Sequence, residues 1–532
     1  MKILNNLLNN SLTKWALNYA EIHYKFKYSF SLYYKKEPEI IFDAPYRLTP
    51  NKPLPISLII KDSHLYPIEI NKIEITGPNG ELFFKLHQET FVDQLLYYEI
   101  FSIPFEKLEK YKNKTISITP TIEYKINKKK KTAVIHNFKQ TSHSSLKTFI
   151  ASGSFPSSDK FLWSDLHIHS FYTHDQVEFG APIEVISKTA EAIGLDSIAI
   201  TDHSYDLDDK MGKYYAPDNN LTRWSNLKED TEKYSSAKTT IFFGEEVSCG
   251  NENNQNVHFL VINNKNFIEG NGDSAENWFK NKPNHFCKDL KKTTPKNTLF
   301  IAAHPNGKVP LFQKILLNRG NWSFNQTEWL NGFQIMNGII NKRLYKSIKL
   351  WTEQLLEGKK FFIYAGNDSH GNFNKFRQIK IPMISLTENN EQILGKHRTG
   401  IIANNNKSDI LNSLISGKCF ITNSFSIDLN VVNEFGNIFE LGESTVGNEF
   451  TIKIKCLSNR EFGNIENVKI FFGDLIKKRE TIIFEKNINT LKYSYKFNLQ
   501  NSNIGYIRAE IKSGKKKNIK FAATNPIWIG KH

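Results

Sequence analysis

The sequence predicts an α/β protein in which a central barrel or sheet lies between two segments rich in β-strands. In the central segment, short apolar runs alternate with segments of helical periodicity. On both sides of it, alternating runs are separated by turn residues, as in β-sandwiches. At 532 residues the chain is too long for one hydrophobic core. The predicted domains are a partly helical lead-in (1–44), a β-sandwich (45–150), an α/β domain (151–423) and a second β-sandwich (424–532).

Charge and cysteine content narrow the functional classes. The net charge is +16, and basic runs such as Lys128–Lys131 and Lys515–Lys517 lie in the flanking segments. Nucleic acid is therefore a candidate partner of the flanks, whereas no basic groove is expected in the central segment. The four cysteines form no Cys-x-x-Cys pair, which favours reduced thiols and a cytoplasmic protein. No stretch of 18 apolar residues is present, so we expect no membrane contact.

A set of polar residues recurs at the ends of apolar, strand-like runs in the central segment. His167 and His169 are two residues apart and therefore point to the same side of one predicted strand. Carboxyl ends of strands are where α/β proteins carry their active groups. Imidazole and carboxylate are suitable ligands for zinc, manganese and iron, and these groups are too many for one ion. The further members of the set are His174, Asp175, Asp202, His203, Glu246, His258, His304, Asp368 and His370.

These motifs, taken together, resemble the PHP (polymerase and histidinol phosphatase) superfamily of metal-dependent phosphoesterases. Asp-Leu-His-Ile-His-Ser at 165–170 is similar to its first motif and Ile-Thr-Asp-His at 200–203 to its second. Gly-Glu-Glu-Val-Ser, Ala-His-Pro and Gly-Asn-Asp-Ser-His are similar to the later ones. The resemblance covers about residues 160–423. It implies a distorted (β/α)7 barrel with two or three divalent metal ions, flanked here by N- and C-terminal β-sandwich domains.

The resemblance also implies which residues would hold each metal. The first would be held by His167, His169, Glu246 and Asp368. Glu246 would bridge to a second, held by His258 and His304. A third would be held by His203, His370 and either His174 or Asp175, because this chain lacks the common Ser-Asp-Gly form there.

The implied activity is hydrolysis of a phosphate ester by a hydroxide that bridges two metals. Phosphomonoesters, nucleotides or nucleic-acid ends are the expected substrates, and a 5′-3′ exonuclease is included. The alternatives are a PHP-type carboxylic-ester or carbamate hydrolase and a non-catalytic binding protein. Asp202 is expected to orient His203 or a water molecule. Lys308, Arg377 and Arg398 are candidate substrate contacts because they lie between the metal motifs.

Overall fold

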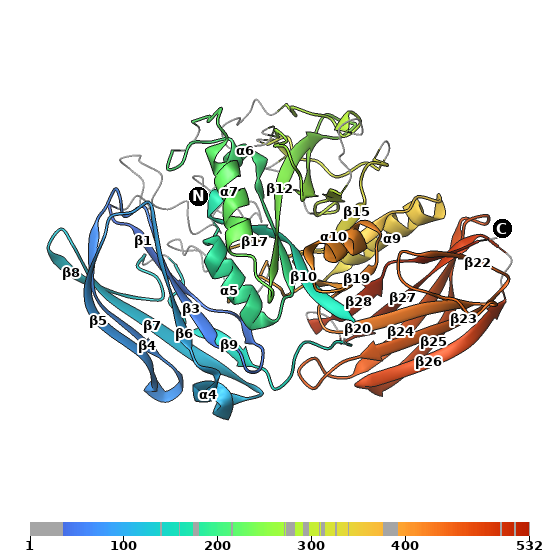
Figure 1. Cartoon of the computed structure of the whole chain (residues 1–532), viewed down its shortest axis with the longest axis horizontal. Coiled ribbons are helices and arrows are strands. Elements are labelled where there is room, and N and C mark those ends of the chain that lie inside the picture. The colour runs from blue at the N-terminus through green and yellow to red at the C-terminus, as the bar shows by residue number, and fades with distance from the viewer. Residues whose placement is uncertain are drawn as a thin grey trace, which may run out of the picture.

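The three parts of the chain lie side by side in the order that they have in the sequence (Figure 1). The N-terminal strands are at one end, a layer of strands and helices is in the middle, and the C-terminal strands are at the other end. The structure is a computed structural model. It describes residues 36–530 except 139–140, 159, 174–179, 214–215, 271, 273–281, 291–296, 308, 310–313, 316, 325–326, 339, 376–391, 501–502 and 515–517.

The N-terminal part consists of two sheets that enclose one apolar core. Alternation of apolar and polar residues gives β4 one buried face, as expected for a sheet that is covered on one side. Most of the lead-in lies outside the described residues, and residues 39–43 of it form a strand that pairs with β3. One sheet contains β1 (Glu39–Asp43), β3 (Leu54–Lys61) and β6 (Leu96–Ile103). The other contains β2 (Arg47–Leu48), β9 (Leu146–Ile150), β7 (Lys114–Ile126), β4 (Ile68–Thr76), β5 (Leu82–Val92) and β8 (Lys129–Val134), and the short helices are η1 (Pro78–Gly80), α4 (Phe105–Leu108) and η2 (Glu109–Tyr111).

The central part is built on one large mixed sheet. Its strands are almost entirely buried, because helices or other strands cover both faces. In spatial order they are β16 (Phe362–Ala365), β15 (Gly332–Met336), β14 (Leu299–Ala302), β13 (Asn256–Ile262), β12 (Thr240–Gly250), β11 (Ser197–His203), β10 (Phe161–His169), β18 (Arg398–Ile402) and β19 (Cys419–Thr422). The short β17 (Ser369–His370) pairs with β10.

This sheet differs from the expected (β/α)7 barrel, and that prediction is wrong. Strand β13 is antiparallel to both of its neighbours. Only Asn251–Gln255 separate β12 from β13, which is too short for a crossover helix and forces a hairpin. Within the described residues no ladder joins β16 to β10, and the sheet instead continues through β19 into the C-terminal strands.

Helices cover the central sheet, and capping residues mark the end of one and the start of another. Helix α5 (Ile183–Ile193) ends at Gly194, which has the left-handed conformation (φ 76°) that glycine adopts without strain. The N-cap of α9 (Lys342–Leu356) is Asn341, whose side chain accepts a hydrogen bond from the Arg343 N–H. The other central helices are η3 (Phe171–Thr173), α6 (Ser204–Leu207), α7 (Thr222–Lys233) and α10 (Lys407–Ile415).

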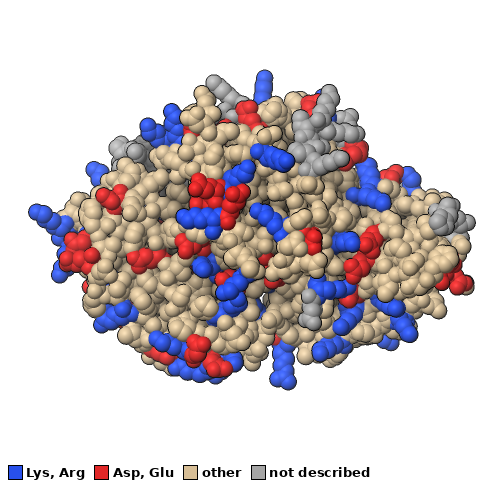
Figure 2. All heavy atoms as spheres, viewed as in Figure 1, with Lys and Arg blue, Asp and Glu red and all other residues tan. Residues whose placement is uncertain are grey.

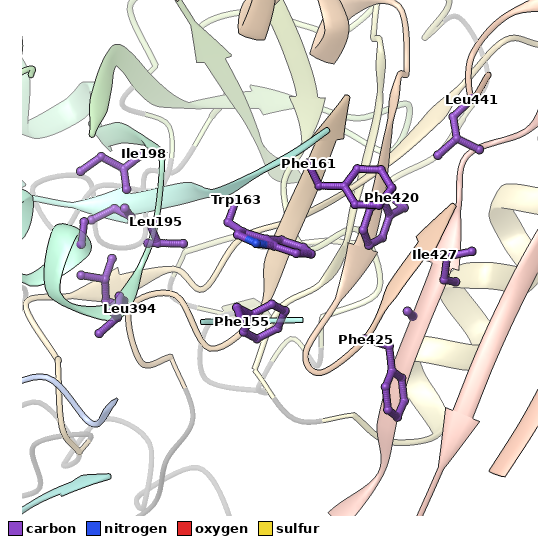
Figure 3. Close-up of a cluster of buried hydrophobic side chains, with 14 of the residues drawn as sticks. Phe155, Phe161, Trp163, Leu195, Ile198, Leu394, Phe420, Phe425, Ile427 and Leu441 are labelled. Carbon is purple, nitrogen blue, oxygen red and sulfur yellow. The ribbon is translucent and has the colours of Figure 1, made fainter. Parts of the chain in front are cut away.

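The C-terminal strands extend the central sheet and place a second sheet against it. Figure 3 shows the aromatic part of the shared core, where Trp163 and Phe161 from β10 lie beside Phe420 from β19 and Phe155. The extension contains β28 (Lys520–Thr524), β27 (Gly505–Ser513), β24 (Ile465–Asp474), β25 (Arg479–Thr490), β22 (Ser444–Val446) and β29 (Ile527–Gly530). The second sheet contains β21 (Ile438–Phe439), β20 (Ser426–Asn433), β23 (Glu449–Leu457) and β26 (Lys492–Gln500).

The surface carries both signs of charge. Basic and acidic side chains are interspersed on the face drawn in Figure 2.

Among the described residues, no helix has both the length and the apolar content needed to cross a bilayer.

Candidate metal centre

The two histidines at the end of β10 form the middle of a buried polar cluster. His167 and His169 are fully buried, and their Nε2 atoms are 3.1 Å apart. The two rings converge because alternate residues of a strand share a face. Gly366 makes room for them, since a Cβ atom there would lie 2.7 Å from the Cβ atom of His167.

Two carboxylates complete a four-atom group with these imidazoles. Glu246 Oε2 lies 3.2 Å from both Nε2 atoms. Asp368 Oδ1 lies 3.4 Å from His167 Nε2 and 3.2 Å from His169 Nε2. In a tetrahedral site with metal–ligand distances of 2.0–2.1 Å, the ligand atoms are about 3.3–3.4 Å from one another. The donor set and its spacing therefore fit a divalent metal such as zinc.

The second oxygen of Glu246 faces another pair of histidines. Glu246 Oε1 lies 2.7 Å from His258 Nδ1 and 3.0 Å from His304 Nε2. One glutamate thus contacts two groups of imidazoles, an arrangement that could bridge two cations. The Arg319 Nη2 atom lies 2.6 Å from His258 Nε2 and 3.1 Å from Nδ1, which brings a permanent positive charge to this side of the cluster.

A third group of potential ligands surrounds His203. The ligand atoms of His169, His203 and His370 lie within 4.8 Å of one another. His203 Nδ1 is also 3.2 Å from Glu246 Oε2, so this histidine lies between the second and third groups. The ring of Tyr205 stacks on His203 with centroids 4.5 Å apart. His174 and Asp175, the two candidates for completing the third group, lie outside the described residues.

Charge in the cluster is shared between imidazoles and carboxylates. Burial alone would lower the pKa of His167 and of His169, but Glu246 and Asp368 outweigh it and raise each pKa to about 9. Burial alone would raise the pKa of Glu246, but His258, His167 and His203 hold it well below its ordinary value. The pKa of Asp368 is lowered in the same way by His167 and His169, against the effect of burial. Both carboxylates are therefore ionised at neutral pH.

Neighbouring side chains fix the orientation of the histidines. Gln334 Oε1, an acceptor in the middle of β15, lies 2.9 Å from His167 Nδ1. In its neutral form His167 therefore carries its proton on Nδ1 and directs the lone pair of Nε2 into the cluster. The same amide oxygen accepts the N–H of His304. Thr173 Oγ1 lies 3.3 Å from His169 Nδ1 and accepts the N–H of His203.

The buried carboxylate of Asp165 accepts hydrogen bonds from residues next to the ligands. Asp165 accepts hydrogen bonds from the N–H groups of Asn367, Gly395 and His167 and from the Asn367 side chain. Burial raises the pKa of Asp165 to about 6 despite these bonds. This network joins the loop that carries Asp368 to strand β10.

Two candidate ligands have a strained backbone. His304 (φ 31°) and Asp368 (φ 53°) lie in the left-handed region, which costs a residue with a side chain about 1–3 kcal/mol. The side chains of both are partly exposed, 25% for His304 and 16% for Asp368. The cluster is therefore most accessible to solvent at these two residues.

Sequence reasoning missed the residues that position or flank the ligands. Gln334 and Arg319 belong to none of the recognised motifs. The signal for Gln334 was a single polar residue within the apolar run Gly332–Met336. Gln392, which donates to Asp368 Oδ2 at 3.0 Å, had no comparable signal.

Two of the remaining predicted residues have structural roles. Both carboxylate oxygens of Asp202 accept hydrogen bonds from Ser170, so Asp202 holds the turn after His169. The prediction that Arg398 contacts substrate is wrong. Its guanidinium is fully buried, donates to the carbonyl oxygens of residues 193, 194 and 395, and lies 4.3 Å from the Phe155 ring centroid. Lys308 and Arg377 lie outside the described residues.

Comparison with known proteins gives matches only among solved structures. No protein family profile matches the chain, and no curated protein does. A β-glucuronidase from Parabacteroides merdae is 10% identical, with 93% of this chain and 64% of that chain covered and a TM-score of 0.19. A glycosyl hydrolase family 2 member from Bacteroides cellulosilyticus is also 10% identical, with 92% and 63% covered and a TM-score of 0.16. A β-glucuronidase from glycoside hydrolase family 2 has 10% identity, 93% and 50% coverage and a TM-score of 0.20.

The comparisons give no support to the assignment that the motifs suggested. The chain spans slightly less than two thirds of the first of these structures. At such TM-scores no residue of this chain can be matched to a residue of a glycosidase, so their activity is not transferred. No family profile supports the assignment to the PHP superfamily, and the central sheet is not the (β/α)7 barrel that this assignment implied. The assignment, and with it the predicted phosphoesterase, phosphatase or exonuclease activity, is therefore withdrawn.

Proposed function

We propose that the cluster binds two or three divalent metal ions (zinc, manganese or iron) and that the protein is a metal-dependent hydrolase. The observation that carries the proposal is the 3.1 Å separation of the Nε2 atoms of His167 and His169. Because Gln334 holds one proton of His167 on Nδ1, the proton that this ring loses on metal binding is that of Nε2, which then presents a lone pair. A lone pair aimed at a second imidazole and two carboxylates is best stabilised by a cation among them.

The division of the donors supports more than one metal. His167, His169, Glu246 and Asp368 would hold the first. Glu246 would reach the second through Oε1, together with His258 and His304. His203 and His370 would contribute to a third. Bound there, divalent ions supply Lewis acidity and lower the pKa of a coordinated water into the neutral range.

The chain's own residues would bind and orient the reactants. Gln334 keeps His167 in one tautomer, and Thr173 couples His169 to His203. Arg319 places a positive charge beside His258, where it can bind an anionic or strongly polar group of a substrate. The partial exposure of His304 and Asp368 gives the substrate its approach.

The same cluster is poorly suited to glycoside hydrolysis by two carboxylates. That mechanism needs one carboxylic acid that stays protonated near neutral pH and faces the leaving group. The pKa values of Glu246 and Asp368 are both lowered by neighbouring imidazoles. Each oxygen of Glu246 already faces histidine nitrogens, which favours a metal-ligand role over that of a general acid.

The experiment is metal analysis followed by turnover. We expect the purified protein to contain at least two equivalents of transition metal, and dialysis against EDTA to abolish hydrolysis until metal is restored. Turnover of 4-nitrophenyl acetate, 4-nitrophenyl β-glucuronide and 4-nitrophenyl phosphate would show whether a carboxylic ester, a glycoside or a phosphate ester is cleaved. A protein that binds no zinc, manganese or iron at micromolar concentration contradicts the metal site. Full turnover after EDTA treatment contradicts the metal-dependent mechanism.

A further inference from the structure

Two cysteine sulfur atoms lie in contact on the outer side of the central sheet. The Sγ atoms of Cys249 and Cys287 are 2.7 Å apart, closer than two sulfur atoms that are not bonded normally approach. Both residues belong to a buried cluster that includes Val257 and Leu290. We propose that Cys249 and Cys287 form a disulfide bond that fastens residues 283–290 to the end of β12.

The backbone around the pair supports this independently of the sulfur positions. The N–H of Gly250 donates to the carbonyl oxygen of His285 at 2.7 Å, and the N–H of Cys287 donates to the carbonyl oxygen of Gly250 at 3.0 Å. A side chain at Gly250 would collide with Phe286, whose nearest ring atom would be 2.6 Å from the added Cβ. The glycine thus allows a parallel β-bridge between Gly250 and Phe286, and the two cysteines are the neighbours of these bridged residues.

The pair is separate from the metal centre. Residues of β12 alternate between the two faces of the sheet, so Cys249 shares its face with Glu245 and Val247 rather than with Glu246. Glu245 accepts hydrogen bonds from Asn264 and from the N–H of Ile268 on that outer side. The disulfide would therefore form without removing a metal ligand, and the proposal does not depend on the proposed function.

The bond would secure one wall of a cavity. A cavity of about 680 Å³ on this side is lined by His285, Asp289 and Leu290 from the fastened segment. Asp208, Asn264 and Glu269 also line this cavity. Covalent closure between positions 249 and 287 removes freedom from the unfolded chain and holds this wall against β12.

Bond formation needs an oxidant, for which a small-molecule disulfide such as glutathione disulfide is sufficient. The Cys287 thiolate attacks one sulfur of that disulfide and expels a thiolate, which leaves a mixed disulfide on Cys287. Cys249 then attacks the Cys287 sulfur and expels the second thiolate. The two thiol protons end on the two released thiolates, so one disulfide is exchanged for another.

The test is thiol trapping after incubation in a glutathione redox buffer. The full-length protein is acid-quenched, alkylated, digested and examined by mass spectrometry for a peptide linking Cys249 to Cys287. The buried Cys419 and Cys456 serve as internal controls and should be recovered as thiols. We expect the link, a rise in apparent Tm of about 5 °C, and loss of both effects in Cys287→Ser.

A second form of the experiment exposes the two thiols, which are buried in the folded protein. The reduced protein is unfolded and refolded in the same buffer, so that both sulfurs are accessible before the core forms. A Cys249→Ala/Cys287→Ala variant should keep the metal content of the wild type. Recovery of both cysteines as thiols in both arms, or links of Cys249 with other partners, would overturn the proposal.

Discussion

The Nε2 atoms of His167 and His169 face each other at 3.1 Å, with Glu246 Oε2 at 3.2 Å from both. Without a metal, the imidazoles carry protons on these nitrogens, and the carboxylates of Glu246 and Asp368 offset the positive charge. With a metal, the lone pairs of the same nitrogens become ligands.

Substitution of single ligands should show how many metal ions each residue helps to hold. Because Glu246 contacts both groups of histidines, Glu246→Gln should lose most of the bound metal. His167→Ala should lose about one equivalent, since it belongs to the first group alone. Inductively coupled plasma mass spectrometry measures both. His87→Ala, an exposed histidine on β5, is the matched control. A Glu246→Gln protein with its full metal content would refute the bridging role.

Gln334 should raise the affinity for zinc because it fixes the tautomer of His167. Gln334→Met removes the acceptor of the His167 Nδ1 proton while keeping a similar volume, and we expect zinc affinity to fall about 10- to 100-fold. Gln334→Glu keeps an acceptor and should retain most of the affinity. Competition with a chromophoric chelator measures the change.

The control for that series is Gln354→Met on α9, where the amide contacts Lys359 and no ligand. Equal affinities of Gln334→Met and the wild type would mean that Gln334 does not orient His167.

Zinc affinity should rise with pH up to about pH 9. The pKa values of His167 and His169 are raised to about 9 in the folded, metal-free protein, above the ordinary 6.5. Protonation of the pair therefore stabilises the metal-free fold fully below about pH 6.5, and this contribution is lost as the pH rises through 9. Zinc must displace these protons, so affinity should gain about tenfold per pH unit for each proton released.

Chelator competition at pH 6.5, 7.5 and 8.5 gives this slope. His167→Ala removes one of the two titrating groups, so its slope should be shallower than that of the wild type. An affinity that does not change between pH 6.5 and 8.5 would show that the imidazoles are not protonated without metal.

The residues that meet in the cluster could be selected from the sequence, whereas the path of the sheet could not. The i, i+2 spacing of His167 and His169 determines that they share a face, and Glu246 lies where an apolar run ends. Apolar alternation does not give strand direction, so the β12–β13 hairpin was interpreted as part of a barrel. Arg319 reaches the cluster through tertiary packing 61 residues from His258, which no local pattern encodes.

Arg398 should be needed for stability rather than for substrate binding. Its buried guanidinium donates to three backbone carbonyl oxygens, and Arg398→Met would leave all three without this donor. We expect the free energy of unfolding to fall by about 3 kcal/mol or more, with metal content unchanged. Guanidinium chloride unfolding followed by tryptophan fluorescence measures this, and Lys349→Met, an exposed residue of α9, should leave the midpoint in place. Arg398→Lys should recover little, because one ammonium group cannot reproduce the planar fork that spans residues 193 and 395. If Arg398→Met instead kept its unfolding midpoint and raised KM, the side chain would have to reach the substrate by leaving its position between α5 and Phe155.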